Sequence, residues 1–422
     1  MALFGIEWVS LSLPHSLYEP MDDKEKLFST MLGLRSPWFV SEYRVDHARK
    51  RVDIFIDFEK GARFPCPECH DPCELHDTSE RHWRHLNTMQ YETWLHARVP
   101  RTSCPKHGVR QVELPWARSG SGFTLHIEAM VLAMADEMSV AALAEHMGMN
   151  EDSVWRILKH YVDQCRKDMD LRHVTMLAVD EFAVKKGHKY VTMFYDVKGN
   201  RVIHIAEGKG ADTFDDFVQA MDGRLDLAKV QVVCMDMSRS FISACKRVFP
   251  GAAIVFDHFH IIKLVNDVVN RIRIEEAREN EELAKTKYCW LKNPENLTSR
   301  QEERLEGIKD LDLLTAQAYH LRLAIQRLWT VPRPLAKSYL RKWIRWAKKS
   351  RSPQMVDLAK TMASHFDGII ASISLGLSSG FAEGLNTKIR AAFRRAFGFK
   401  APEYRDTMIY MTAGGLVLPT PC

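Results

Sequence analysis

The sequence predicts a multidomain α/β protein, and three observations support this prediction. A central stretch alternates between short apolar runs typical of strands and amphipathic runs typical of helices. Closely spaced cysteine and histidine pairs precede this stretch, and a long, charged, helical region follows it. With 422 residues, 46% of them hydrophobic, the chain is long enough for two to four domains with cores of their own.

Composition argues against a membrane or secreted protein. No apolar run reaches the length of a membrane-spanning helix, and residues 1–20 lack the basic start of a signal peptide. The nine cysteines are odd in number and unevenly spaced, which indicates a reducing cytosol with some thiols on a metal. The net charge of +5 is small, so any affinity for nucleic acid must come from local patches. We expect a cytoplasmic protein without a membrane partner.

The first domain is expected at residues 21–115, after an extension at residues 1–20. Residues 24–34 have the apolar spacing of a short helix. Residues 38–58 alternate on either side of a polar centre, which predicts a β-hairpin.

Two ligand pairs within this domain predict a structural zinc site. Cys66-Pro-Glu-Cys69 and Cys104-Pro-Lys-His107 each separate two soft ligands by two residues, and this spacing lets both side chains reach one tetrahedral ion. Cys66, Cys69, Cys104 and His107 fill all four positions, which leaves none open for chemistry. Unliganded thiols are the alternative, and Cys73 is a possible substitute ligand.

Residues 120–168 predict three short amphipathic helices with helix-turn-helix spacing. Ser139 and Asn150 are suited to helix N-caps, and Gly148 marks the turn between the last two helices. The alternative is a plain helical bundle without a ligand. We predict DNA contacts from the last helix, at positions expected to be exposed: Ser153, Trp155, Arg156 and Lys159.

Residues 172–263 predict three strands, a helix, a strand, a helix and a strand. The first strand, residues 176–179, ends on Asp180 and Glu181, and the later strands end on Asp236 and Asp257. This order of elements fits a ribonuclease-H-like core, in which the strands that end on Asp180 and Asp236 are neighbours. Glu181 would then point to the opposite face of the sheet from Asp180.

Residues 264–375 predict an all-helical insertion into this core, and residues 376–410 return to it with a basic helix. The stretch 333–351 is rich in basic residues and contains Trp343 and Trp346, so it is either a solvated helix face or a DNA backbone surface. Residues 411–422 are expected to form a weakly ordered tail. The basic residues of the returning helix are predicted to face DNA phosphates from one side: Lys388, Arg390, Arg394 and Arg395.

Three carboxylates are predicted to form a divalent-metal site. Asp180 and Asp236 at the ends of buried strands are costly unless paired or metal-bound, and Glu383 lies in the first turn of the basic helix. Oxygen ligands suit Mg²⁺ or Mn²⁺. Two such ions about 4 Å apart activate the attacking oxygen and stabilise the leaving oxygen in phosphodiester chemistry. Each acid alone also has a structural interpretation, and Asp257 is the rival to Asp236.

His258 and His260 directly follow Asp257. The sequence leaves them open as capping residues or as side chains that approach DNA.

In combination and in order, these motifs resemble the ISL3 family of bacterial insertion-sequence transposases. The resemblance runs from about Met21 to about Tyr410, which favours residues 1–20 as an extension or Met21 as the start. It is carried by FPCPEC with RVPRTSCPKHG, the helix-turn-helix, VDEF with KKGHKY, CMDMSRSF, DHFHIIKLVN, and GFAEGLNTKIR with RRAFGF. It implies a DDE transposase whose acids are Asp180, Asp236 and Glu383.

The resemblance also implies partners: terminal inverted repeats, target DNA and at least one further copy of the chain, in association with the bacterial nucleoid. The leading hypothesis is therefore metal-dependent DNA cleavage and strand transfer. The alternative is a zinc and helix-turn-helix regulator with a non-catalytic core. A third possibility is a structure-selective nuclease of the same fold.

Overall fold

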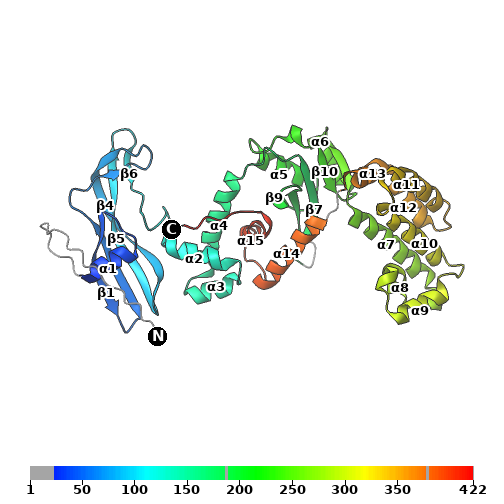
Figure 1. The fold of residues 1–422 in the computed structure, drawn as a ribbon, viewed down its shortest axis with the longest axis horizontal. Helices are drawn as coiled ribbons and strands as arrows, with labels where there is room; N and C mark the ends of the chain where they lie inside the picture. The colour runs from blue at the N-terminus through cyan, green and yellow to red at the C-terminus, as the bar shows by residue number, and fades with distance from the viewer. Residues whose placement is uncertain (1–22, 186–188, 377–379, 422) are drawn as a thin grey trace, which may run out of the picture. The chain divides into compact units, whose positions relative to one another are not determined.

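The computed structural model describes residues 23–185, 189–376 and 380–421 (Figure 1). The chain folds as two compact units: one contains the chain up to Glu137 together with the residues from Pro419 on, and the other contains residues 138–418. The extension predicted at residues 1–20 lies outside the described residues. Within the described residues, no helix is both long and apolar enough to cross a membrane.

The first unit is built on a six-stranded sheet in the order β1-β2-β5-β4-β3, with β6 paired to β5. The β1–β2 hairpin confirms the prediction at residues 38–58. One face of the sheet packs around Trp116, whose ring lies edge-on to Trp38 and Trp83 at 4.9 and 5.7 Å. The elements are α1 (Asp23–Met31), β1 (Trp38–Asp46), β2 (Arg51–Phe58), β3 (Phe64–Pro65), β4 (Pro72–Thr88), β5 (Tyr91–Cys104), β6 (Gly108–Gln111) and α2 (Leu125–Ala135).

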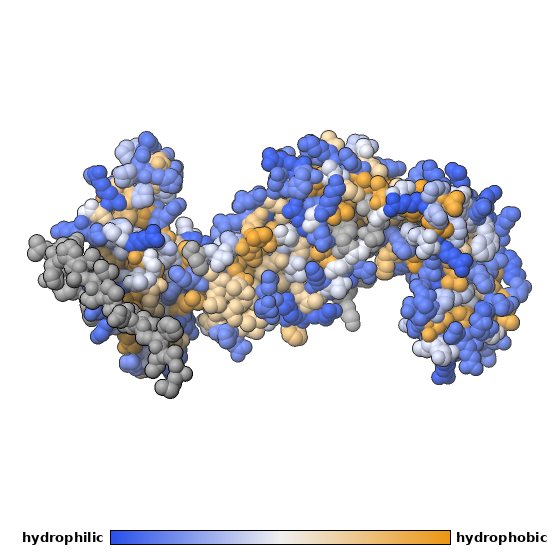
Figure 2. Space-filling model, in the orientation of Figure 1, coloured by the Kyte–Doolittle hydropathy of each residue, from blue (hydrophilic) through white to orange (hydrophobic). Residues whose placement is uncertain are grey.

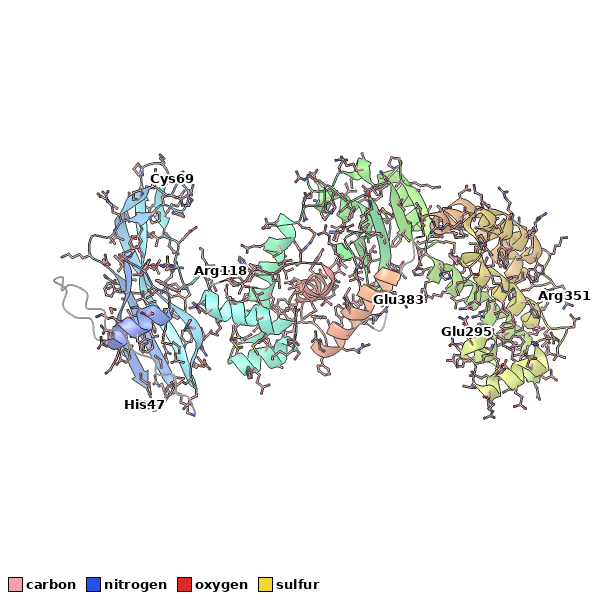
Figure 3. All side chains as sticks on the ribbon, viewed as in Figure 1. His47, Cys69, Arg118, Glu295, Arg351 and Glu383 are labelled. Carbon is pink, nitrogen blue, oxygen red and sulfur yellow. The ribbon has the colours of Figure 1, made fainter. Side chains whose placement is uncertain are left out.

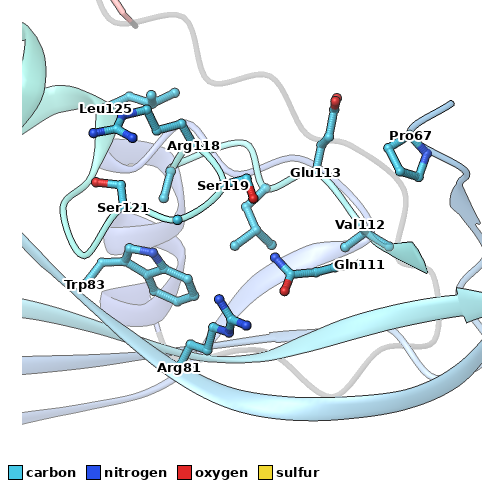
Figure 4. Close-up of a pocket in the computed structure, with 13 residues that line it drawn as sticks. Pro67, Arg81, Trp83, Gln111, Val112, Glu113, Arg118, Ser119, Ser121 and Leu125 are labelled. Atoms are coloured by element: carbon cyan, nitrogen blue, oxygen red, sulfur yellow. The ribbon is translucent and has the colours of Figure 1, made fainter. Parts of the chain in front are cut away.

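A loop between β6 and α2 is tied to α2 by an ion pair whose carboxylate is buried. Glu128 is fully buried, and its carboxylate accepts hydrogen bonds from Arg118 Nε at 3.0 Å and Ser121 Oγ at 2.6 Å. A buried carboxylate requires such partners. A cleft remains between the loop and β4, with Arg81 and Trp83 on the β4 side and Arg118 on the loop side (Figure 4).

Three helices follow as predicted: α2, α3 (Val140–Met147) and α4 (Glu151–Asp168). The predicted caps are confirmed, because Ser139 Oγ accepts from the Ala142 N–H and the Asn150 side chain accepts from the Asp152 N–H. Gly148 ends α3 at a φ of 60°, a backbone conformation that glycine adopts without steric cost. The boundary between the two units falls between α2 and α3.

The second unit contains a five-stranded mixed sheet in the order β11-β10-β7-β8-β9. The predicted order of strands and helices is confirmed. β7, β8 and β9 pair antiparallel, whereas β10 runs parallel to both β7 and β11. The elements are β7 (Met176–Lys185), β8 (Lys189–Asp196), β9 (Arg201–Glu207), α5 (Asp212–Met221), β10 (Val232–Met235), α6 (Arg239–Val248) and β11 (Ala253–Phe256).

The predicted end of the first core strand, at Val179, was wrong. β7 continues to Lys185 because β8 pairs with it along this length, whereas its pairing with β10 is recorded only as far as Ala178. Asp180 and Glu181 therefore lie inside a strand, at the point where the parallel neighbour ends.

Helices cover both faces of this sheet. Leu177 and Val179 of β7 pack in the core shared with α5 and α6. Ala178 and Phe182 pack in a second core with α14 (Gly380–Ala396) and α15 (Pro402–Ala413) (Figure 1). Because side chains alternate along a strand, Asp180 points to the α14 face and Glu181 to the other.

The expected weak order of the tail from residue 411 was wrong for its first part. The helix α15 continues to Ala413, and Leu416 and Leu418 pack against the core beneath α14 and α15. The sequence analysis did not predict a separate α15.

Between β11 and α14 the described elements are all helical and share one hydrophobic core. Hydrophilic residues cover most of the visible surface of this segment (Figure 2). The two tryptophans of residues 333–351 differ in their environment, because Trp343 is buried and its indole N–H donates to the Leu321 carbonyl, whereas Trp346 is 46% exposed. The larger helices are α7 (His258–Glu276), α8 (Lys287–Leu291), α9 (Ser299–Ile308), α10 (Leu314–Gln326), α11 (Arg333–Ala347), α12 (Pro353–Ser364) and α13 (Phe366–Leu375).

The helical segment is attached to the sheet where α13 crosses β11. A Cβ at Gly368 would overlap the Phe256 ring and lie 2.9 Å from the Ile254 carbonyl oxygen. We predict that Gly368→Ala lowers the free energy of unfolding by about 1–3 kcal/mol, because the strand backbone cannot move aside. Gly307→Ala is the control, since open space surrounds that position in α9 and the helix gains about 0.5–1 kcal/mol. Urea denaturation measures both, and equal stabilities would contradict the close approach.

Candidate functional site

Strand register brings three aspartates to one edge of the core sheet. β10 pairs with β7 with Cys234 opposite Ala178, and with β11 with Met235 opposite Phe256. Asp236 and Asp257 are the first residues after β10 and β11, so both lie at the strand ends that adjoin Asp180. Neighbouring strands are about 4.8 Å apart, so the three residues lie close together.

The Asp180 carboxylate is held by side chains from distant parts of the chain. Its Oδ2 accepts a hydrogen bond from Asn386 Nδ2 at 2.9 Å, and its Oδ1 accepts from the Glu181 N–H at 2.9 Å. The Asn386 side chain is itself buried and accepts from Tyr195 Oη at 2.8 Å. This chain of hydrogen bonds attaches α14 to β7 and β8.

His260 stands beside the aspartates, whereas His258 packs elsewhere. The Nδ1 atom of His260 lies 2.8 Å from Asp257 Oδ2, and its Nε2 atom lies 3.8 Å from Asp180 Oδ1. The ring of His258 packs on Trp329, with 4.0 Å between centroids. We call Asp180, Asp236 and Asp257 the acidic edge. His260 is therefore the histidine that contacts this edge.

Electrostatics at this edge favour a bound cation. Burial raises the pKa of Asp180, and the charge of Asp257 adds to this shift. Burial also raises the pKa of Glu181, with Asp236 adding to it. The hydrogen bond to Asp257 raises the pKa of His260 against the effect of burial. The oxygen donors and the surplus of carboxylates suit a hard divalent ion.

Glu383 lies one helical turn before Asn386, in the first turn of α14, and is exposed. It lines a cleft with Asp257 and His258 of the core and with Glu295 of the helical segment. Figure 3 labels Glu383 on α14 and Glu295 on the helical segment. Residues 377–379, which precede α14, lie outside the described residues. Glu383 thus shares a cleft with Asp257 and lies one helical turn from Asn386, the residue that donates to Asp180.

The three predicted acids do not form one tight group. Among the described residues, one set of three or more potential ligands has all its ligand atoms within 4.8 Å of one another, and it consists of the four predicted zinc ligands. Asp180, Asp236 and Glu383 are farther apart than this criterion allows.

The four predicted zinc ligands converge in the first unit. Cys66 Sγ and Cys104 Sγ each lie 3.6 Å from His107 Nδ1, and Cys69 Sγ lies 3.7 Å from Cys104 Sγ. A tetrahedral zinc ion with metal–sulfur distances of about 2.3 Å requires sulfur–sulfur separations of roughly 3.8 Å, so the donor set fits the ion.

Groups around the zinc ligands favour the thiolate form of Cys104, which is the form that binds zinc. Burial raises the pKa of the Cys104 thiol, but the N–H groups of Lys106 and His107 and the neighbouring thiols lower it to about 7. The second ring nitrogen of His107 lies 3.7 Å from the Glu68 carboxylate, which orients the imidazole. Cys73 stays outside the group and donates to the Asp71 carbonyl.

Two of the predicted DNA contacts on α4 are not exposed, so that expectation was wrong. Ser153 and Trp155 are 8% and 5% exposed, and the Trp155 ring stacks on Tyr404 of α15 at 5.0 Å. The helix α15 covers this flank of α4, which the sequence analysis had assigned to solvent. Arg156 is exposed, and the half-exposed Lys159 pairs with Asp163.

The four cations of α14 are exposed but do not share one face. At 100° per residue, Lys388 and Arg395 lie on one flank, whereas Arg390 and Arg394 point about 160° and 120° away from Lys388 around the helix axis. The prediction of a single basic face was therefore wrong. Arg390 also lies over the ring of Phe182, 5.4 Å from its centroid.

Comparison with known families accounts for most of the chain. A transposase family model, that of ISL3, matches residues 177–409. The helix-turn-helix domain of transposase family ISL3 matches residues 112–162, and the zinc-finger of transposase IS204/IS1001/IS1096/IS1165 matches residues 62–107. The chain belongs to the ISL3 family of transposases.

Curated relatives of this transposase have similar length. The transposase for insertion sequence element IS1557 of Mycobacterium tuberculosis is 28% identical over 92% of this chain and 96% of its own length. The transposase for insertion sequence element IS1001 of Bordetella parapertussis is 26% identical over 80% and 86%. The solved HTLV-2 integrase catalytic core is 14% identical over 34% of this chain and 90% of its own. Its TM-score of 0.15 is too low to bear on the fold.

Sequence reasoning missed Asn386 and Tyr195. Glu383 and Asn386 are three residues apart on a helix, so they are neighbours on its surface. This spacing was the one feature of the sequence that could have linked Asn386 to the predicted metal site. Nothing in the sequence links either residue to Tyr195, about 190 positions earlier.

The zinc group yields a test with a matched control. We predict that Cys104→Ser removes bound zinc, because it deletes one of four soft ligands. Cys73→Ser is expected to leave the stoichiometry unchanged, since that thiol lies outside the group. Metal analysis of both purified variants by mass spectrometry is the measurement. Zinc retained in Cys104→Ser, or lost in Cys73→Ser, would count against this ligand set.

Proposed function

We propose that this transposase binds the terminal inverted repeats of its element and performs two-metal-ion DNA cleavage and strand transfer. Asp180, Asp236 and Glu383 are the residues that would hold Mg²⁺ or Mn²⁺. The observation that carries the proposal is the geometry around Asp180. Asp236 directly follows β10, the strand that pairs with β7, and Asn386, one turn from Glu383, donates to the Asp180 carboxylate.

The acidic edge supplies what hard cations require. Its donors are carboxylate oxygens, and they outnumber the single His260 that faces them. When bound, two such cations activate the attacking oxygen and stabilise the leaving oxygen. The protein orients the ligands: Asn386 holds one oxygen of Asp180, and Asp257 fixes the ring of His260.

Glu383 completes the ligand set from the cleft between the sheet and the helical segment. Because α14 is attached to β7 through Asn386, Glu383 stays within one turn of that contact. Its exposure in the cleft leaves room for a DNA strand to reach the carboxylates.

We further propose a division of labour along the chain. Residues 21–115 form the zinc-binding domain, residues 120–168 the DNA-reading helices, and residues 172–263 with 376–410 a ribonuclease-H-like core. Residues 264–375 are a helical insertion in that core. Pairing two element ends requires at least a dimer. The proposed DNA contacts omit the buried Ser153 and Trp155 and keep the remaining cations: Arg156, Lys159, Lys388, Arg390, Arg394 and Arg395.

The charge of Asp180 provides the direct test. Asp180→Asn is expected to lower cleavage of element-end DNA in Mg²⁺ by at least about a hundredfold, because a neutral amide is a poor ligand for a hard cation. Its affinity for the same DNA should match wild type. Asp222→Asn, at an exposed aspartate after α5, removes the same charge away from the cluster and should cleave normally. Full cleavage by Asp180→Asn would refute the assignment. Wild-type binding without cleavage would indicate the regulator alternative.

The support of Asp180 by Asn386 gives a second prediction. Asn386→Ala should reduce cleavage by about 10- to 100-fold with DNA affinity unchanged, because it removes the group that orients a metal-binding carboxylate. Tyr195→Phe should have a smaller effect, since Asn386 can still donate to Asp180. Cleavage rates at several Mn²⁺ concentrations distinguish the two, because a positioning role raises the metal requirement. A normal rate and metal dependence in Asn386→Ala would exclude this role.

A further inference from the structure

A phenylalanine just beyond the C-terminal end of α14 has an unusual environment. Phe397 is 98% exposed, and its backbone has a φ of 53°, in the left-handed region. A bulky side chain is rare in that region because its Cβ approaches the backbone. The chain therefore accepts both a strained backbone and an aromatic ring in water at one position. Such outliers are characteristic of functional positions.

The turn that carries Phe397 is firmly anchored. Two residues later, the Phe399 ring packs against Phe393 of α14 at 4.8 Å and against Trp155 of α4 at 5.9 Å. The next helix, α15, begins at Pro402. The exposure of the Phe397 ring is thus set by fixed neighbours on both sides of it in the chain.

Several cationic side chains lie near this turn in the chain or line a cleft beside it, and one of them, Lys400, lies 3.6 Å from the Glu151 carboxylate. Arg394 and Arg395 occupy the last turn of α14 and are exposed. A cleft beside the turn, lined also by Gly398 and Phe399, has several cationic side chains on its walls. Among its described lining residues Glu207 is the sole acid, and Arg405 binds it. The cations of the cleft are Lys189, Lys209, Lys400 and Arg405.

We propose that Phe397 is a wedge that inserts between adjacent base pairs of the DNA held by the transposase. Every base offers a flat face on which an aromatic ring stacks, and apolar side chains inserted at a base step kink the duplex. Arg394 and the lysines of the cleft bind the phosphates beside the opened step. Duplex DNA is the partner that matches both features, because it offers stacking faces and a dense negative charge. The inference rests on the proposed binding of element ends and is independent of the metal chemistry.

The test uses the full-length, zinc-loaded protein and element-end duplexes that carry 2-aminopurine at successive positions, without added Mg²⁺ or Mn²⁺ so that no cleavage occurs. Wild type should raise the fluorescence at one step, because unstacking relieves the quenching of this base. Phe397→Ala should lose that rise and bind roughly tenfold more weakly. Phe397→Trp should retain the rise, because its ring also stacks.

Two variants control for other effects. Val417→Ala removes an apolar side chain that is 90% exposed elsewhere in the same unit and should behave as wild type. Thermal unfolding of Phe397→Ala should match wild type, since the ring makes almost no contact within the chain. Arg394→Ala should weaken binding and reduce its salt dependence while leaving the fluorescence rise at saturation.

Several outcomes would overturn the wedge. One is a full fluorescence rise and normal affinity in Phe397→Ala. Another is wild type that binds element ends without any rise, which leaves the proposed repeat binding intact. A third is a change in the oligomeric state of Phe397→Ala in solution while its DNA signals stay unchanged. That result would make the ring a contact between copies of the chain. Wild type that does not bind element ends would overturn both proposals.

Discussion

A buried hydrogen-bond chain from Tyr195 through Asn386 to Asp180 is the contact on which the core of this transposase depends. It joins β8, α14 and β7, although Asn386 lies 191 and 206 residues from its two partners. Buried polar groups that lose a partner bear their full cost of desolvation, so the three side chains hold one another in place. Because Glu383 is on the same helix, this contact also determines where the third acid can be. The helical segment from α7 to α13 therefore begins after β11 of the sheet and ends before α14, which is attached to the same sheet.

The acidic edge carries an electrostatic cost that the proposed function explains. Asp180 is largely removed from water and has Asp257 as a neighbour, so its pKa is raised. A fold selected only for stability would replace such a group with an apolar side chain. The chain instead keeps carboxylates in register on three adjacent strands and places His260 between two of them. In the proposed function, divalent cations offset this repulsion, as a zinc ion would for the thiols of Cys104 and its neighbours.

Packing within the fold also decides which aromatic residues are available for the proposed contacts with DNA. Trp155 has the residue type expected for stacking on a base, but it stacks instead on Tyr404 and supports the turn that exposes Phe397. The aromatic residue that is available to a base is therefore a different one from the residue that the helix pattern indicated. Phe397 could not be chosen from the sequence, because neither its exposure nor its positive φ has a local signature.

Local chemistry alone determined the zinc ligands, the helix caps at Ser139 and Asn150, and the order of strands and helices in the core. Each depends on residues a few positions apart, or on short pairs whose spacing matches one ion, so the linear sequence contains the required information. Tertiary structure decided the length of β7, the burial of Trp155 and the partner of Asp180. These depend on β8, α15 and α14, which approach from tens to hundreds of residues away. The physical reason is that strand pairing and side-chain burial are set by whichever surface arrives from elsewhere in the chain, and no local pattern specifies that surface.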